Sequence, residues 1–194
     1  MPSLQAAAPT LVAVAVMVAL FTYMGWSGLL VGRDALWALA WPAALLLNAP
    51  LHEASHALAG WAQGLAVLEW RAWGLAGNYV RFNGNVTLAV LAAPYLRDLA
   101  SFALSALLLS RTPPRRRALW MGIFAVGMLL PLWNTTVEYT SLFAGRSSDL
   151  RGLLALLGPG AVHAGFGLAV LGYLCATARV VRQAGQKAGS HLPT

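Results

Sequence analysis

The chain has 194 residues, of which 59% are hydrophobic and 10% are charged, and its mean hydropathy is +0.65. Because soluble domains carry roughly 25% charged residues, this composition excludes an ordinary soluble protein and predicts an integral membrane protein in contact with the lipid bilayer. The net charge of +7 comes mainly from arginines at the ends of apolar runs, so it predicts contact with lipid headgroups and no nucleic-acid binding. The only cysteine, Cys175, excludes an internal disulfide.

Five apolar runs are long enough to cross a bilayer as helices. They cover residues 9–31, 35–61, 88–110, 118–143 and 153–178. The first run has no Lys or Arg before it and is longer than the apolar part of a signal peptide, so we expect a retained helix. The expected fold class is an all-α membrane protein with about five transmembrane helices, in a single domain over residues 1–186 followed by a flexible tail at 187–194.

The second run contains the sequence L-H-E-A-S-H-A at residues 51–57. His52 and His56 are four residues apart, so on a helix they project from the same face and can bind one metal ion. Glu53 is close enough to hold and deprotonate a water bound to that metal. Ionisable groups at membrane depth are costly unless they are paired or bind metal, which favours a functional site. The alternative is a pair of structural histidines that share Glu53 as their hydrogen-bond partner.

The long apolar pattern stops after the second run, and residues 64–87 have a different periodicity. Polar and apolar side chains alternate from Val67 to Trp73 and again from Tyr79 to Phe82, which is the periodicity of β-strands, and Asn83-Gly84 is a hairpin signal. We expect a short β-hairpin or a re-entrant loop at the membrane surface. An edge strand here would bind an extended peptide by strand addition; alternatively, the segment is only an interfacial loop.

The later runs contain the remaining ionisable residues at membrane depth. Arg97 and Asp98 lie deep in the third run, so each needs a partner or water. Helices in series place alternate loops on opposite sides of the membrane, which brings Asp149 to the same side as the two histidines. Hydrolytic zinc sites take three protein ligands and leave one position for water, and a carboxylate is the natural third. We favour Asp149 as this ligand; Glu138 is its rival, and His163 is more simply explained by helix packing.

Three motifs stand at residues 52–56 (H-E-A-S-H), 92–94 (A-A-P) and 148–154 (S-D-L-R-G-L-L). Through them the chain resembles the site-2 protease family of intramembrane zinc metalloproteases, particularly its small bacterial members. The first matches the family's HExxH motif, the second stands where the family has a small-Gly-Pro element, and the third is similar to the motif whose Asp is the third zinc ligand. The sequence departs from the family at Leu150, where the family has Gly, and at Arg97, where it has Asn.

The resemblance implies a zinc metallopeptidase that hydrolyses peptide bonds within or at the edge of the membrane by a zinc-activated water. One Zn²⁺ per chain would be held by His52, His56 and Asp149, and Glu53 would act as general base and then as general acid. Asn134 is a candidate for stabilising the oxyanion or positioning the substrate, with helix packing as the alternative. The alternative functions are a metal-binding membrane protein that does not cleave, such as a pseudoprotease or scaffold, and an ion or proton path.

The expected partners are a membrane protein or peptide as substrate and the lipid bilayer, and a homo-oligomer is left open. The resemblance to small bacterial members implies the cytoplasmic (inner) membrane of a bacterium. The membrane side of the site also stays open. Arginines are concentrated in the loops opposite the histidines, so the positive-inside rule places the zinc towards the outer face, whereas the resemblance implies a site on the cytosolic side.

Overall fold

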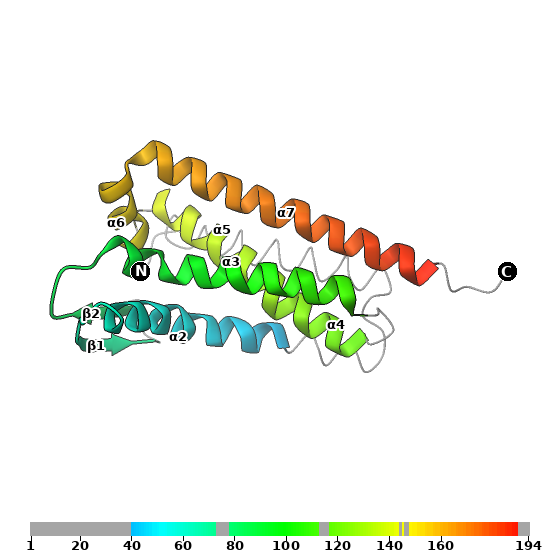
Figure 1. Cartoon of the computed structure of the whole chain (residues 1–194), viewed down its shortest axis with the longest axis horizontal. Helices are drawn as coiled ribbons and strands as arrows, with labels where there is room; N and C mark the ends of the chain where they lie inside the picture. Colours follow the sequence, from blue (N-terminus) through cyan, green and yellow to red (C-terminus); the bar gives the residue numbers. More distant parts are fainter. Residues whose placement is uncertain (1–39, 73–77, 113–116, 144, 146–147, 190–194) are drawn as a thin grey trace, which may run out of the picture.

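The computed structural model describes residues 40–72, 78–112, 117–143, 145 and 148–189. Within them the chain is mostly helical and contains one two-stranded hairpin, as the sequence predicted. The elements in chain order are α2 (Ala40–Trp61), β1 (Val67–Arg71), β2 (Tyr79–Phe82), α3 (Leu88–Arg111), α4 (Arg117–Phe124), the π-helical segment η2 (Ala125–Leu129), α5 (Leu130–Phe143), α6 (Ser148–Leu157) and α7 (Pro159–Gly189). Figure 1 shows the long helices running along the long axis of the molecule, with the hairpin and α6 at one end. The predicted helix at 9–31 and residues 35–39 of the second run lie outside the described residues.

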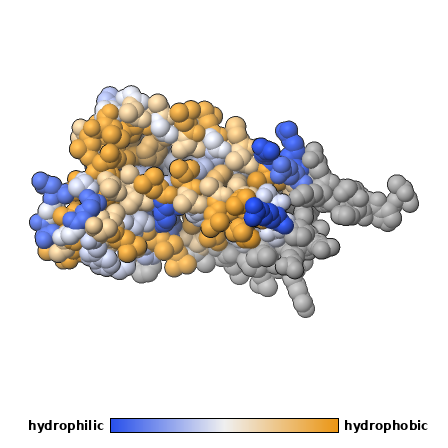
Figure 2. Space-filling model, in the orientation of Figure 1, coloured by the Kyte–Doolittle hydropathy of each residue, from blue (hydrophilic) through white to orange (hydrophobic). Residues whose placement is uncertain are grey.

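Three helical segments in the described part of the chain are long and apolar enough to cross a membrane: Leu88–Arg111, Trp120–Phe143 and Pro159–Ala184. Large apolar side chains on them face outward, and Leu104 and Leu168 are 57% and 70% exposed. On the visible face, hydrophobic side chains cover most of the middle of the molecule and hydrophilic ones gather at its two ends (Figure 2). Helix α2 is not among the three, because its histidines, glutamate and asparagine lower its hydropathy.

Strands β1 and β2 form the predicted hairpin, an antiparallel pair directly after α2. The Asn83-Gly84 dipeptide follows β2 rather than joining the two strands, and residues 73–77, which connect them, lie outside the described residues. The ring of Phe82 fits against Gly60 near the end of α2, where a larger residue than glycine would collide with it. This contact holds the hairpin beside the helix that carries the HExxH motif.

The fourth predicted run forms α4, η2 and α5 in direct succession. The wide turn of η2 coincides with two features of the sequence. Gly127 lies so close to Ser105 of α3 that no side chain would fit between them, and Pro131 cannot donate a hydrogen bond to the carbonyl of Gly127. A π-helical turn shifts the register of the residues that follow it, so it helps to direct Asn134 and Thr135 of α5 into the interior, where both are buried.

The predicted start of the fifth run was wrong. Residues 153–157 belong to the short helix α6, and α7 begins at Pro159. Gly158 between them has a φ of +79°, a conformation that favours glycine, and a proline disfavours helical geometry in the residue before it. At its other end α7 continues to Gly189, past the predicted start of the flexible tail, and residues 190–194 lie outside the described residues.

Candidate metal site

Two helices far apart in the sequence bring three side chains together that can bind a metal. His52 and His56 belong to α2, and Asp149 belongs to the first turn of α6. The two Nε2 atoms are 3.3 Å apart, and Oδ2 of Asp149 is 3.2 Å from Nε2 of His52 and 3.0 Å from Nε2 of His56. Both histidines are buried and Asp149 is half-buried. Among the described residues this is the one such group, and we call it the metal-ligand group.

The size of the triangle formed by these three atoms is compatible with one small metal ion in tetrahedral coordination. In tetrahedral coordination with ligand distances of 2.0–2.1 Å, neighbouring ligand atoms lie about 3.3–3.4 Å apart. The edges of 3.0 to 3.3 Å are close to this value, and three protein ligands leave the fourth position for water. Hydrogen bonding explains the triangle less well, because two ring nitrogens that face each other must also share a single carboxylate oxygen.

A proline in α3 determines the hydrogen bond that orients His56. Nδ1 of His56 donates its N–H to the backbone carbonyl of Val90 at 2.7 Å. In an uninterrupted α-helix that carbonyl would accept the N–H of residue 94, but Pro94 has none. The carbonyl is therefore free to bind the imidazole, and the hydrogen bond leaves Nε2 as the nitrogen that faces the metal-ligand group.

Asp149 is positioned by the packing of α6. Its neighbour Leu150 is fully buried in a small core with Leu153 and Val162, which explains a leucine where the resembled family has glycine. Burial would raise the pKa of the Asp149 carboxyl, but its close contacts with the His52 and His56 rings outweigh this effect and hold the pKa below its usual range. The carboxylate is thus ionised at neutral pH, which is the state that binds metal.

The other predicted ionisable residues contribute no atom to the triangle. Glu53 is buried on α2, and its carboxylate interacts electrostatically with all three members of the metal-ligand group. Glu138, the rival third ligand, is half-buried on α5 and within electrostatic range of Glu53. His163 on α7 lies 3.0 Å from the hydroxyl of Tyr139. Of the two carboxylates that the sequence left open, the structure brings Asp149 to the histidines.

Four polar side chains form a closed ring of hydrogen bonds one helical turn from His52. Asn48 donates through Nδ2 to Oδ1 of Asn134 (2.8 Å), and Asn134 donates through Nδ2 to Oδ2 of Asp98 (2.5 Å). Oδ1 of Asp98 accepts from Nε (3.0 Å) and Nη2 (2.5 Å) of Arg97, and this Nη2 also reaches Oδ1 of Asn48 (3.3 Å). We call these four residues the polar ring.

The polar ring supplies the partners that the sequence predicted Arg97 and Asp98 to need. It also engages both the oxygen and the nitrogen of the Asn134 amide in hydrogen bonds within the bundle, while an oxyanion role for Asn134 stays a prediction. Asn48 was missed in the sequence analysis. The signal was present, because Asn48 precedes His52 by four residues and therefore lies on the same face of α2.

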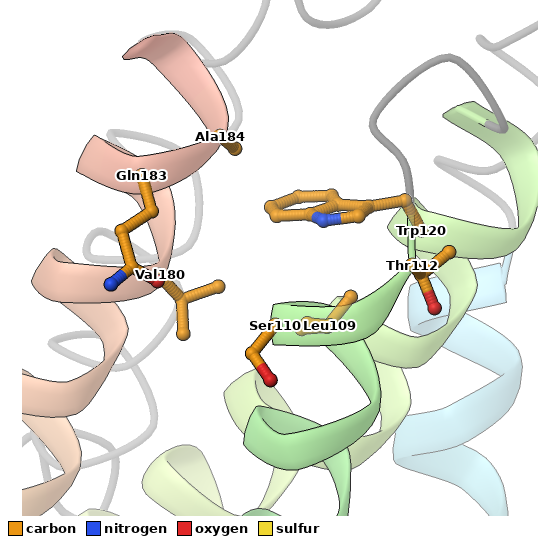
Figure 3. Close-up of a pocket in the computed structure, with 7 residues that line it drawn as sticks. All are labelled: Leu109, Ser110, Thr112, Trp120, Val180, Gln183 and Ala184. Atoms are coloured by element: carbon orange, nitrogen blue, oxygen red, sulfur yellow. The ribbon is translucent and has the colours of Figure 1, made fainter. Parts of the chain in front are cut away.

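A small hollow lies at the other end of the bundle, between α3, α4 and α7. Trp120 forms one side of it, and Val180 and Gln183 lie opposite (Figure 3). Leu109, which also lines the hollow, is 19 residues (109 − 90) along α3 from Val90, or about 28 Å at 1.5 Å per residue. The hollow is therefore remote from the metal-ligand group.

Comparison with known proteins gave no family assignment: no protein-family model, curated protein or solved structure matches the chain significantly. The geometry of the site and the resemblance of its motifs are therefore the features from which a function can be inferred.

Proposed function

We propose that this protein is an intramembrane zinc metalloprotease similar to the site-2 protease family. The observation that carries the proposal is the triangle of His52, His56 and Asp149, with edges of 3.0 to 3.3 Å and with Glu53 buried beside it. A metal bound only for structure would need the three ligands. It would not need an additional acidic residue next to them at a membrane depth where its charge is costly.

Each part of the site has a separate role in the proposed reaction. A zinc ion held by the metal-ligand group would supply a Lewis acid and lower the pKa of its bound water towards 7. Glu53 takes the proton of the attacking water and passes it to the departing amine, so that one carboxylate serves first as base and then as acid. The Val90 carbonyl keeps His56 in the tautomer that offers Nε2 to the metal.

The proposed setting is the bilayer. The three membrane-length apolar segments of the described chain, together with α2 and the apolar run at 9–31, would give five transmembrane helices in the inner membrane of a bacterium. The metal-ligand group lies at the hairpin end of the bundle, where α2 ends and α3 begins. Cleavage would therefore take place nearer one membrane surface than the bilayer centre.

The proposed substrates are membrane-associated proteins or peptides that unwind before they are cut, because helical carbonyls are otherwise hydrogen-bonded within the helix. The hairpin offers a way to hold the unwound form. Within the described residues strand β1 pairs with β2 alone, which leaves its second edge for strand addition by an extended peptide. Phe82 of β2 packs on Gly60 and keeps the hairpin close to the end of α2.

The experiment that tests this function combines zinc content with cleavage of a co-expressed membrane substrate, for wild type and Glu53→Gln. We expect about one zinc per chain in both proteins and cleavage by the wild type alone, because the substitution removes the base and leaves the ligands. If both proteins hold zinc and neither cleaves any member of a broad substrate panel, the chain is a non-cleaving metal-binding protein. A wild type without zinc would reject the metal site itself.

A further inference from the structure

One face of the hairpin is charged. The side chains that share it belong to two cross-strand pairs, Glu69–Arg81 and Arg71–Tyr79. The carboxylate of Glu69 accepts a hydrogen bond from the hydroxyl of Tyr79. It lies 3.8 Å from Nη2 of Arg71 and 3.6 Å from Nη2 of Arg81. Two guanidinium groups thus face a single carboxylate, which leaves this face of the hairpin with one net positive charge.

Arg71 is the cation of this face that an added strand would meet first. Its guanidinium lies over the ring of Tyr79, 5.3 Å from the ring centroid, and its side chain is 46% exposed. A strand that pairs with the second edge of β1 lies about 4.8 Å away, and its residue opposite Arg71 points to the same face. Arg81 belongs to β2 and would be one strand further, about 9–10 Å away. A carboxylate beside Arg71 would therefore balance the charge of this face.

The other face of the hairpin favours an apolar neighbour. Trp70 alternates with Glu69 and Arg71 along β1, so its side chain points to the opposite face. There it lies opposite Val80 of β2 and is 54% exposed. A peptide shifted by one residue would exchange its two faces and place an acidic side chain beside Trp70, so the two faces exclude this shift. A bulge at Leu68 limits regular pairing to the three residues that follow it in β1.

The hairpin is held about one helical turn from the metal-ligand group. Gly60 follows His56 by four residues on α2, so it lies on the same face of the helix and about 6 Å further along its axis. A Cβ atom at Gly60 would collide with the ring of Phe82, which shows that β2 packs directly on this position. Figure 1 shows the hairpin at the margin of the molecule, alongside the end of α2. The register of a peptide on β1 therefore affects which of its bonds reaches the metal-ligand group.

We propose that Arg71 selects substrates with an Asp or Glu at one position of the segment that pairs with β1. This inference rests on the proposed function and names the class of substrate: an extended segment in which an acidic residue is flanked by apolar ones. A peptide fits this surface better than a lipid headgroup does. The second edge of β1 offers both N–H and C=O groups, which a peptide backbone pairs with and a phosphate does not.

The test exchanges charges on both sides of the contact, in micelles of an uncharged detergent. A series of model substrates carries Asp or Lys at one position at a time on either side of the cleaved bond. For the wild type we expect one position at which Asp gives a kcat/KM about fivefold higher than Lys does. Arg71→Glu should reverse this preference at the same position, and Arg71→Gln should abolish it. Peptide binding to the zinc-loaded Glu53→Gln protein, with and without Arg71→Glu, should show the same order in Kd.

Arg81→Glu is the matched control, because it makes the same change of charge on the same face but on the other strand, and it should keep the preference for Asp. The role of Arg71 is overturned, while the protease function stands, if the wild type cleaves Asp and Lys peptides equally at every position. The same holds if both Arg71 variants bind zinc and still prefer Asp, or if Arg81→Glu alone reverses the preference.

A lipid contact would give a different result. Arg71→Glu would then change the cleavage of all peptides alike, and only after phosphatidylglycerol is added to the micelles, which would also overturn the role of Arg71 in substrate selection. Failure of the wild type to cleave any peptide overturns both this inference and the proposed function.

Discussion

Replacing Pro94 with alanine tests whether α3 controls the metal-ligand group. An N–H at position 94 would compete with Nδ1 of His56, at 2.7 Å, for the carbonyl of Val90. Loss of such an outer-shell partner typically costs roughly 10–100-fold in metal affinity. Because a carbonyl can accept two hydrogen bonds, the imidazole would keep part of its interaction, and we expect zinc affinity to fall by about tenfold.

The free energy of unfolding of the metal-free Pro94→Ala variant should change little, because two effects oppose each other. Alanine is about 3 kcal/mol more favourable than proline inside a helix. Pro94 is fully buried, so the loss of two methylene groups costs about 1.6 kcal/mol and the remaining cavity about 1 kcal/mol. The net change lies within about 1 kcal/mol of zero. Zinc affinity should therefore fall without a matching loss of stability.

Two measurements in detergent micelles check this prediction: competition for zinc with a chromophoric chelator, and denaturant unfolding of the metal-free protein. Pro131→Ala is the matched control. Pro131 is also fully buried inside a helix, but it lies on α5, which contributes no residue to the metal-ligand group. If Pro94→Ala binds zinc as tightly as the wild type, or if Pro131→Ala loses the same affinity, the link between Pro94 and His56 is refuted.

Three further predictions concern the ring, the hairpin and the metal. Asn134→Leu should lower the free energy of unfolding by about 2–4 kcal/mol in a denaturant titration, because Asp98 and Asn48 each lose a buried partner; a loss below about 1 kcal/mol would contradict the ring's contribution. Gly60→Ala should cost about 1–3 kcal/mol, since the new methyl group meets the ring of Phe82, and Phe82→Leu should recover part of the loss in the same assay. Removal of zinc by a chelator should abolish cleavage and lower the Tm, because free zinc at 100 times its Kd stabilises the folded protein by about 2.7 kcal/mol. An unchanged Tm would argue against a metal site.

The sequence by itself determined the features that depend on local periodicity. The four-residue spacing of His52 and His56 places them on one face of any α-helix, whatever surrounds it. The alternation around Val67 and Tyr79 predicted the hairpin for the same reason, because side chains point to opposite faces of a strand in turn. The apolar runs predicted the long helices from their length alone. The break before α7 was also present locally, in the pair Gly158-Pro159, and was overlooked.

Only the tertiary structure decided which distant residues meet. Asp149 and Glu138 are both carboxylates near the same end of the bundle, and their spacing from the histidines does not distinguish them. The packing of Leu150 in its small core directs Asp149 to the histidines. The contact of Val90 with His56 likewise requires α2 and α3 to lie side by side, so Pro94 alone could not reveal which donor would take the freed carbonyl.

In the polar ring, too, the sequence determined one part and the tertiary structure decided the other. The sequence required partners for Arg97 and Asp98, because neither charge is stable alone among apolar helices. It did not say which partners, since Asn48 and Asn134 come from two other helices and reach the pair only when α2, α3 and α5 pack together. The donors and acceptors of a side chain follow from its residue type, so the sequence shows that a buried Arg or Asp requires partners. Which groups become those partners depends on distances between segments, which only the packed bundle determines.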